Sequence, residues 1–425
     1  MPTTDLANGN GKPILVIGGG IAGCTAAIEA AETGRDVVLL EKSPYLGGRV
    51  AAFHQYFPKL CPPSCGLEIN FKRLRNNPRI TVLTLAELRQ LSGEPGDYEA
   101  VAALAPRHVS EACTLCGECA KVCPAEISDD FNFGLAKTKA VSIQRPGAFP
   151  PMYRIQRAAC PAGCQACADA CKYGAIHLEQ GGEERKFRVS SVVVATGWAP
   201  YDATKIENLG FGKCANVVTN VILERLAAAG GPTGGKVLRP SDGKEPKSIA
   251  FVQCAGSRDE NHLPYCSAVC CSASLKQATY LRTLYPEAKV AIFYIDVRTA
   301  GRLQEFAAKV RADENIELVK GKIGTIEEDP ATGNLLVTGE DVAQGKKITR
   351  SFELVVLAMG IVPQTSGLPA GMPLDEFGFF VGDSQKGWYG AGCAKRPAEV
   401  AAVTRDATGM ALKALQIATG ATHNG

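Results

Sequence analysis

The side chains with the clearest capacity for chemistry in this 425-residue sequence are its 17 cysteines. In a large protein without a visible secretory signal, disulfides are disfavoured, and clustered cysteines more often bind metal or carry out redox chemistry. Twelve of them fall into three groups with regular spacing. The sequence therefore predicts three [4Fe–4S] clusters, and two at the least.

The first group lies in "CTLCGECAKVCP", which contains Cys113, Cys116, Cys119 and Cys123 followed by proline. This is the spacing of bacterial ferredoxins, in which three thiolates bind one [4Fe–4S] cluster and the fourth binds a second. A zinc site is the alternative, because zinc needs only four sulfurs in tetrahedral geometry, but it rarely uses this run.

The second group, in "CPAGCQACADACKYGAI", contains Cys160, Cys164, Cys167 and Cys171. Its first gap is one residue longer than in the first group, and no proline follows the last cysteine. If the usual ferredoxin exchange holds, the first cluster uses Cys113, Cys116, Cys119 and Cys171, and the second uses Cys160, Cys164, Cys167 and Cys123. A structural loop without metal is the alternative for the second group.

The third group lies in "VQCAGSRDENHLPYCSAVCC" and contains Cys254, Cys266, Cys270 and Cys271. The stretch reads as the end of a buried strand, a loop and the start of a helix, where a dinucleotide-binding domain cradles phosphate. No G-x-G-x-x-G is present in "QCAGSRD". Thiolates are soft ligands suited to iron–sulfur clusters, and their negative charge repels a pyrophosphate. We therefore expect a cluster in place of NAD(P).

An intact glycine motif lies near the N-terminus, where Gly18, Gly20 and Gly23 follow a strand and begin a helix. These glycines allow a tight turn, close approach of a pyrophosphate and close packing of the helix, whose N-terminus faces the negative charge. Glu41 ends the next strand, where a carboxylate can bind ribose hydroxyls. Further residues expected to bind this cofactor are Lys42, Gly48, Arg49, Thr196, Gly197, Lys276, Gly392 and Cys393.

This set resembles the flavoproteins of the thioredoxin reductase type, which have two dinucleotide-binding domains. The resemblance implies FAD. In that family the last flavin motif carries Gly-Asp, and the Asp contacts the ribityl chain, whereas this sequence has "GAGCA" with Cys393 after Gly392. The departure leaves the ribityl contact open.

Three further sites have two interpretations each. Cys61 and Cys65 are placed like a redox dithiol, but Pro62 and Pro63 prevent a shared helical face, so a structural or auxiliary-ligand role is the alternative. Lys276 follows Cys271 on the same expected helix and could reach the flavin, or it could be a solvated lysine. Cys24 and Cys214 are interpreted as packing residues.

The elements that position these residues follow two β-α-β patterns. "PILVIGGG", "IAGCTAAIEAAETG" and "DVVLLEK" form the first, and "SIAFVQ", residues 267–285 and "KVAIFYID" form the second. "FELVVLAMG" and the tail from Gly378 are expected to rejoin the first sheet. We expect an α/β fold with two Rossmann domains of the thioredoxin reductase type and a ferredoxin-like insertion. The expected ranges are 1–104, 183–246 and 350–425 for the FAD domain, 105–182 for the insertion, and 247–349 for the NAD(P)-domain-like unit.

Composition excludes some functional classes. The net charge of +3 and the scattered basic residues do not support a nucleic-acid-binding protein. No apolar run approaches the roughly 18–20 residues that cross a bilayer, so no direct membrane span is expected. The N-terminal "MPTTDLANGNGKP" shows no hydrophobic leader. We therefore expect a cytoplasmic protein, in which any attachment to a membrane comes through a partner.

The cysteine arrangement resembles that of HdrA, the flavin-containing subunit of heterodisulfide reductase. More closely, five stretches resemble the HdrA-like flavoprotein of the quinone-interacting membrane-bound oxidoreductase (the Qmo complex): "PYLGGRVA", "YFPKLCPPSCGLEINF", "ATGWAPYDATKIENLGFG", "GPTGGKVLRPSDGKE" and "VQCAGSRDENHLPYCS". The likeness runs over nearly the whole chain. It implies a subunit that relays electrons between a quinone-linked membrane partner and cytoplasmic adenylylsulfate reductase in dissimilatory sulfur metabolism. The implied partners are a second HdrA-like subunit, together with a haem/iron–sulfur membrane subunit.

The sequence is therefore interpreted as an oxidoreductase, a flavo-iron–sulfur electron-transfer subunit that needs no general acid, base or nucleophile. Three alternatives remain. One is a bifurcating subunit of the heterodisulfide reductase type. Another is an NAD(P)H-dependent thiol oxidoreductase that uses Cys61 and Cys65. The third is a scaffold whose cysteines bind zinc.

Overall fold

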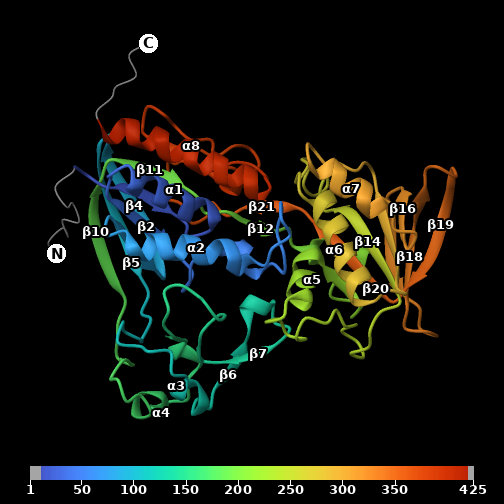
Figure 1. The fold of residues 1–425 in the computed structure, drawn as a ribbon, viewed down its shortest axis with the longest axis horizontal. Coiled ribbons are helices and arrows are strands. Elements are labelled where there is room, and N and C mark those ends of the chain that lie inside the picture. The colour runs from blue at the N-terminus through green and yellow to red at the C-terminus, as the bar shows by residue number, and fades with distance from the viewer. Residues whose placement is uncertain (1–10, 420–425) are drawn as a thin grey trace. The chain divides into compact units, whose positions relative to one another are not determined.

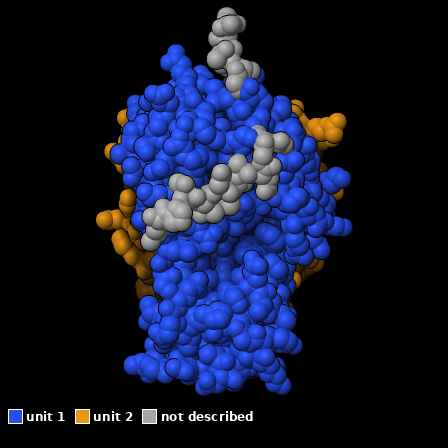
Figure 2. Space-filling model, turned by 90° about the vertical axis from the view of Figure 1, so that its left-hand side faces the viewer, with its two compact units in different colours: residues 1–198, 363–396, 400–425 blue, residues 199–362, 397–399 orange. Residues whose placement is uncertain are grey.

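The structure is a computed structural model that describes residues 11–419, and the chain in it forms two compact units. Unit 1 comprises residues 1–198, 363–396 and 400–425, and unit 2 comprises residues 199–362 and 397–399 (Figure 2). Most of the N-terminal stretch in which no secretory leader was expected lies outside the described residues. Within residues 11–419, no helix has both the length and the apolar character needed to cross a membrane.

Unit 1 is built on a five-stranded sheet in the order β22-β11-β1-β2-β3. Its strands are β1 (Ile14–Ile17), β2 (Val37–Glu41), β3 (Ile80–Thr84), β11 (Ser191–Val194) and β22 (Trp388–Gly390), and their pairings are parallel. The strands are apolar and mostly buried because both faces of the sheet are covered, as is typical of parallel sheets.

Helices cover one face of this sheet, and a second sheet covers the other. The helices are α1 (Ile21–Glu32), α2 (Pro63–Asn76) and α8 (Val400–Ala418), and α1 packs against both α2 and α8. The second sheet contains β4 (Ala86–Glu94), β5 (Asp97–Leu104) and β10 (Glu183–Val189). Because side chains alternate along a strand, Leu15 and Ile17 face this second sheet and form a core with Tyr98 and Phe187.

The insertion lies between β5 and β10 and has little regular structure (Figure 1). Its elements are α3 (Glu118–Lys121), β6 (Glu126–Ser128), β7 (Lys137–Lys139), β8 (Val141–Ser142), β9 (Arg154–Ile155) and α4 (Ala166–Asp169). A small separate core contains three of its cysteines, Cys119, Cys123 and Cys167. A segment of this size with so small an apolar core is of the kind that usually needs a metal or cross-link for stability.

Unit 2 repeats the same plan. Its parallel sheet has the order β13-β20-β14-β15-β16. The strands are β13 (Val217–Thr219), β14 (Ser248–Ala255), β15 (Lys289–Tyr294), β16 (Ile316–Lys320) and β20 (Leu354–Met359). The helices α5 (Asn220–Ala227), α6 (Cys270–Leu284) and α7 (Leu303–Arg311) pack on one face. The second β-α-β pattern of the sequence is thus confirmed as β14, α6 and β15.

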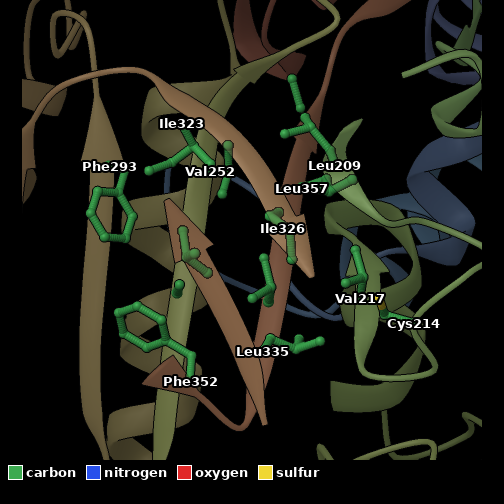
Figure 3. Close-up of a cluster of buried hydrophobic side chains, with 14 of the residues drawn as sticks. Leu209, Cys214, Val217, Val252, Phe293, Ile323, Ile326, Leu335, Phe352 and Leu357 are labelled. Carbon is green, nitrogen blue, oxygen red and sulfur yellow. The ribbon is translucent and has the colours of Figure 1, made fainter. Parts of the chain in front are cut away.

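An antiparallel sheet of β17 (Ile323–Glu328), β18 (Leu335–Asp341) and β19 (Lys346–Phe352) covers the other face of unit 2. Figure 3 shows the core between the two sheets, in which Phe293 and Phe352 lie edge to face with ring centroids 5.9 Å apart. Cys214 is buried in the same core, consistent with the packing role expected for it.

The structure corrects one expectation about the sheets and differs from one expected range. "FELVVLAMG" was expected to rejoin the first sheet, but its strand β20 pairs with β13 and β14 in unit 2. A buried apolar strand has the same composition in either sheet, so the pattern cannot distinguish them. Residues 199–246, which were grouped with the FAD domain, are part of unit 2. Two short strands, β12 (Trp198–Pro200) and β21 (Ile361–Pro363), lie where the chain passes between units.

Candidate functional site

The first glycine loop connects β1 to α1, and two of its glycines have no room for a side chain. Gly18 has φ +105°, and a Cβ atom on it would lie 2.4 Å from the Ala195 carbonyl oxygen. A Cβ atom on Gly23 would lie 1.7 Å from the carbonyl oxygen of Gly18. The tight turn and the close packing of α1 on the strand therefore depend on glycine, as the motif predicts.

Gly20 differs from Gly18 and Gly23 because there is open space where its side chain would be. The nearest atom to a Cβ on Gly20 would be the Cα of Gly48 at 3.8 Å, and Gly20 forms an isolated parallel bridge with Gly47. Two bare backbone segments therefore lie side by side at the N-terminus of α1. This is a cradle in which a pyrophosphate can approach the backbone and the free N–H groups of the helix.

Glu41 at the end of β2 is directed at the glycine loop. Its Oε2 accepts a hydrogen bond from the Gly19 N–H at 2.6 Å, and its Oε1 accepts one from the Ser43 N–H at 2.6 Å. Burial raises the pKa of the carboxyl group, while these two hydrogen bonds lower it. Lys42, by contrast, is exposed and forms an ion pair with Glu87 at 3.0 Å.

Thr196 and Arg49 lie in the same unit. The hydroxyl oxygen of Thr196 is buried and has no hydrogen-bond partner among the described residues. Gly197 follows with φ +75°, and the Arg49 Nε donates to the Trp198 carbonyl oxygen at 3.2 Å. A buried hydroxyl without a partner is unusual in a protein, and a polar cofactor would satisfy it.

The last flavin motif has a different arrangement from the usual Gly-Asp. Cys393 is buried, and the adjacent Gly392 N–H donates to Oδ2 of Asp406 on α8 at 2.9 Å. The second oxygen of Asp406 accepts from the Lys395 ammonium at 3.0 Å. A carboxylate thus lies beside this loop, but it comes from the following helix. Sequence reasoning missed Asp406 because no fixed spacing links it to the glycine.

The cradle at Gly20, the acid at Glu41 and the Thr196 hydroxyl, which no described residue satisfies, together fit a bound FAD. The fit rests on the open space at Gly20, which a side chain would fill, and on the buried hydroxyl of Thr196, which needs a hydrogen-bond partner. The free thiol of Cys24 does not contribute, because it is buried in α1 and donates to the Gly19 carbonyl oxygen at 3.2 Å.

In the insertion, one pocket brings together the cysteines that the ferredoxin exchange assigns to the first cluster. Cys113, Cys116, Cys119 and Cys171 all line it, together with Tyr153 and Tyr173. Cys171 therefore joins a group from which it is about fifty residues distant in sequence. Burial and the charges of Cys113, Cys116 and Cys167 raise the pKa of Cys119 to about 11.

The second group is also drawn together, though with fewer described contacts. Burial and the charges of Cys160 and Cys123 raise the pKa of Cys167, and Cys123 is not among the residues that line the pocket of the first group. For Cys164 the structure gives a backbone contact: its carbonyl oxygen accepts a hydrogen bond from Nη1 of Arg157 at 2.9 Å. The role of the Cys164 thiolate as a ligand stays a prediction.

The third group converges at the end of β14 and the start of α6. Cys254 lies at a register shift in β14 and has φ +57°, and Cys270 and Cys271 begin α6. Burial and then the charges of Cys254, Cys271 and Cys266 raise the pKa of Cys270, so all four cysteines are close neighbours. Four thiolates so close together would repel one another, and a soft metal centre would relieve that repulsion.

The donor sets fit clusters in their chemistry. Among residues 11–419, no three His, Cys, Asp or Glu side chains converge as ligands of a single metal ion. A cluster differs from a single-ion site because each thiolate binds a different iron of the cluster. When bound, such clusters would carry single electrons.

Cys61 and Cys65 lie outside these groups. Cys65 is exposed in the first turn of α2, and Cys61 precedes the helix, whose first residue is Pro63. The two therefore share no helical face, as expected from the prolines. Tyr56 lies beside both, and burial together with their charges raises the pKa of its hydroxyl.

Lys276 is the site residue whose surroundings differ most from expectation. Its Nζ lies 2.9 Å from Oε1 of Glu224, and both side chains are buried. The solvated-lysine alternative is therefore wrong, because the carboxylate allows the ammonium to be buried. Contact of Lys276 with the flavin stays a prediction.

Sequence reasoning also missed Arg258, Asp296 and Arg298, which surround the third cysteine group. Asp296 and Arg298 follow β15, and Arg258 follows β14. Because the carboxyl ends of neighbouring parallel strands meet at one edge of a sheet, their convergence could have been anticipated from the second β-α-β pattern.

Comparison with known proteins agrees with this geometry. Residues 13–59 match the family of FAD-dependent oxidoreductases. Thioredoxin reductase from Lactococcus lactis superposes with a TM-score of 0.53 at 14% identity, covering 96% of this chain and 99% of that one. The enzyme from T. acidophilum gives 0.52 at 15% identity, covering 97% and 99%. The expected thioredoxin reductase-like α/β fold is confirmed.

The sequence relatives are more specific. An HdrA-type iron–sulfur subunit of the CoB–CoM heterodisulfide reductase of Methanopyrus kandleri is 40% identical over 355 residues, which are 83% of this chain and 54% of the relative. The HdrA-type subunit of the H2:CoB–CoM heterodisulfide,ferredoxin reductase of Methanothermobacter marburgensis is 35% identical over 416 residues, 94% of this chain and 63% of the relative. The chain thus spans between about half and two-thirds of the length of these relatives.

The matched family and these relatives both support an oxidoreductase. Over most of its length the chain is therefore similar to A subunits of heterodisulfide reductases, and its residues 13–59 match FAD-dependent oxidoreductases within a thioredoxin reductase-like fold.

Proposed function

We propose that this chain is a flavo-iron–sulfur electron-transfer subunit. The observation that carries the proposal is the position of the third cysteine group. Cys254, Cys270 and Cys271 occupy the turn from β14 to α6 in unit 2, whereas the equivalent turn in unit 1 keeps its glycine cradle. One chain thus offers a site suited to a dinucleotide and a second site suited to a metal–sulfur cluster.

The roles of the residues follow from their contacts. FAD, when bound, takes up two electrons and releases them one at a time, and clusters carry single electrons. Gly20 leaves the backbone open to the pyrophosphate, Glu41 is held toward the loop by Gly19, and Thr196 presents a hydroxyl that has no partner within residues 11–419. In the insertion, Cys171 and Cys123 complete groups that begin elsewhere in the sequence.

The finer function that we propose is electron relay between a quinone-linked membrane partner and adenylylsulfate reductase. The sequence stretches that resemble the HdrA-like flavoprotein of the quinone-interacting oxidoreductase support it. The partners would be a second HdrA-like subunit, together with a haem/iron–sulfur membrane subunit. The chain itself would be cytoplasmic and peripheral to the inner membrane.

A second candidate is a subunit of the heterodisulfide reductase type that divides electrons between two acceptors. The identity of 35–40% to heterodisulfide reductase subunits favours it. The two candidates differ in the acceptor. Electron transfer from the reduced chain to adenylylsulfate reductase supports the first. Transfer that needs heterodisulfide reductase partner subunits, with CoB–CoM heterodisulfide as acceptor, supports the second.

The decisive experiment is anaerobic purification followed by quantification of iron, acid-labile sulfide and flavin. Three [4Fe–4S] clusters give about 12 iron and 12 sulfide per FAD, and two give about 8. A Cys266→Ala/Cys270→Ala variant is expected to lower iron to about 8 with FAD unchanged. Cys214→Ala is the matched control, because Cys214 is a buried core residue of the same unit and should leave iron unchanged. Zinc without sulfide would contradict the proposal.

A further inference from the structure

Two arginines beside the third cysteine group share one carboxylate. The Arg258 Nη1 lies 2.6 Å from Asp296 Oδ1, and the Arg298 Nη2 lies 3.1 Å from Asp296 Oδ2. Arg258 comes from the loop after β14, whereas Asp296 and Arg298 come from the loop after β15. The two loops meet because these strands are parallel neighbours.

The triad lies beside the cysteines, and Asp296 contacts one of them directly. The Cys271 Sγ lies 3.5 Å from the Asp296 carbonyl oxygen. Burial raises the pKa of Cys254, and the nearby charge of Arg258 lowers it. The hydrogen bond and charge of Asp296 raise the pKa of Arg298, and the charge of Cys266 adds to this effect. The ion pairs with Asp296 thus hold two positive groups beside the sulfurs of the same site.

The backbone around the triad is unusual in the same place. Cys254, Arg258 and Ala268 have φ of +57°, +56° and +60°, a region that residues other than glycine rarely adopt. The loop is nevertheless fixed, since the Arg258 N–H donates to the Tyr265 carbonyl oxygen at 3.1 Å and the Ala268 N–H donates to the Cys266 Sγ at 3.3 Å. Such conformations persist only where surrounding contacts over-determine them, and they concentrate at functional sites.

We propose that Arg258 and Arg298, aligned by Asp296, are positioning residues that raise the reduction potential of a cluster held by Cys254, Cys266, Cys270 and Cys271. The inference rests on the proposed function. Reduction adds one electron, and therefore one negative charge, to a centre already surrounded by thiolates. Cationic hydrogen-bond donors on the ligand sulfurs stabilise the reduced state more than the oxidised state. Asp296 offsets part of this charge, but its ion pairs hold both guanidiniums at the site.

The test is an anaerobic redox titration with dithionite as reductant, followed by electron paramagnetic resonance, on the full-length holoprotein. The signal of this cluster is assigned by its loss in Cys266→Ser. Arg258→Gln and Arg298→Gln are each expected to lower its midpoint potential, with at least a tenfold fall in the one-electron equilibrium constant, or about 59 mV. The potentials of the flavin and of the clusters in the insertion should stay unchanged.

Arg311→Gln is the matched control, because Arg311 is an exposed arginine of α7 in the same unit. It should leave the midpoint potential unchanged. Arg258→Lys and Arg298→Lys keep the charge but cannot contact both the thiolate and Asp296 with a planar fork. Their potentials should fall between those of the wild type and the glutamine variants.

The outcomes separate this inference from the proposed function. A chain without a cluster at Cys254, Cys266, Cys270 and Cys271 in the wild type refutes both, and an iron content that does not fall in the Cys266→Ala/Cys270→Ala variant reveals it. A full complement of clusters with an unshifted potential in the arginine variants overturns the inference alone. If the glutamine variants lose the cluster, the lysine variants decide, because a lowered potential supports the inference and a wild-type potential overturns it.

Discussion

The Nζ of Lys276 lies 2.9 Å from Oε1 of Glu224, with both side chains buried in unit 2. Glu224 also accepts hydrogen bonds from Gln277 Nε2 at 2.8 Å and from the Tyr280 hydroxyl at 3.5 Å. The pair joins α5 to α6, the helix that begins with Cys270 and Cys271. The contact that positions Lys276 is therefore internal to the unit that carries the third cysteine group.

Lys276→Met is expected to destabilise the protein by about 3–5 kcal/mol, because it leaves the Glu224 carboxylate buried without its counter-ion. The double variant Lys276→Met/Glu224→Gln should recover much of this loss, since no unpaired charge remains. Chemical denaturation of both variants measures the difference. If Lys276 instead serves the flavin, Lys276→Met will change the flavin potential and the double variant will not restore it.

The glycine cradle gives a second prediction. Gly23→Ala is expected to abolish FAD binding, because the new Cβ would lie 1.7 Å from the Gly18 carbonyl oxygen and would push α1 away from β1. Gly409→Ala is the matched control, because Gly409 lies in a helix of the same unit, and a Cβ there would meet no described atom within 4 Å apart from its chain neighbours and the backbone of its own helix. Flavin absorbance of the purified variants is the measurement. Retention of FAD by Gly23→Ala would show that the cofactor does not bind at this loop.

Removal of the Thr196 hydroxyl is expected to weaken cofactor binding without changing the stability of the apoprotein. Thr196→Val should weaken FAD binding roughly tenfold, the effect of losing one hydrogen bond of about 1–1.5 kcal/mol. It should leave the apoprotein as stable as before, because the hydroxyl has no partner among the described residues. Ser191→Ala provides the contrast, since the Ser191 hydroxyl donates to the Ala414 carbonyl oxygen at 3.1 Å. Ser191→Ala should lower stability and leave FAD affinity unchanged. Thermal unfolding measures the stability, and fluorescence titration measures the affinity.

The exchange of cysteines in the insertion can be tested through additivity. Cys113→Ser/Cys171→Ser should remove about as much iron as either single variant, because both residues serve one cluster. Cys113→Ser/Cys123→Ser should remove about twice as much, because these residues serve different clusters although they are close in sequence. Iron and sulfide assays decide between the two. Equal losses in both double variants would mean that Cys123 shares a cluster with Cys113.

Local spacing explains which parts of the site were predictable. Gly18, Gly23 and Glu41 could be identified because a strand, a turn and a helix impose fixed separations between them. The grouping of Cys171 with Cys113 followed from a known pairing rule, since nothing in the local sequence connects them. Site residues that lie within one β-α-β unit can thus be identified from their order in the sequence.

Contacts between elements that are distant in the sequence could not be predicted from it. Strand β20 is apolar throughout and could belong to either parallel sheet, so its place in unit 2 depends on packing with β13 and β14. Lys276 and Glu224 were not linked because they are on different helices and have no sequence signature. Asp296 and Arg258 meet only because neighbouring strands end together.

Glu41 provides a prediction about pH. Burial raises the pKa of its carboxyl group in the folded protein, so the folded state binds a proton more tightly than the unfolded state does. Stability therefore falls as the pH rises from the unfolded pKa, about 4.3, toward the folded one. Glutamine does not titrate, so the stability of Glu41→Gln relative to the wild type should increase over this range.

The same substitution should weaken FAD binding, because a neutral amide accepts hydrogen bonds from ribose hydroxyls less strongly than a carboxylate. It also removes one acceptor, since the amide nitrogen cannot accept from either the Gly19 or the Ser43 N–H. Denaturation at several pH values and FAD titration at neutral pH give both quantities. A stability difference that does not change with pH would mean that Glu41 titrates alike in the folded and unfolded chain. The hydrogen bonds from Gly19 and Ser43 would then fully offset the effect of burial.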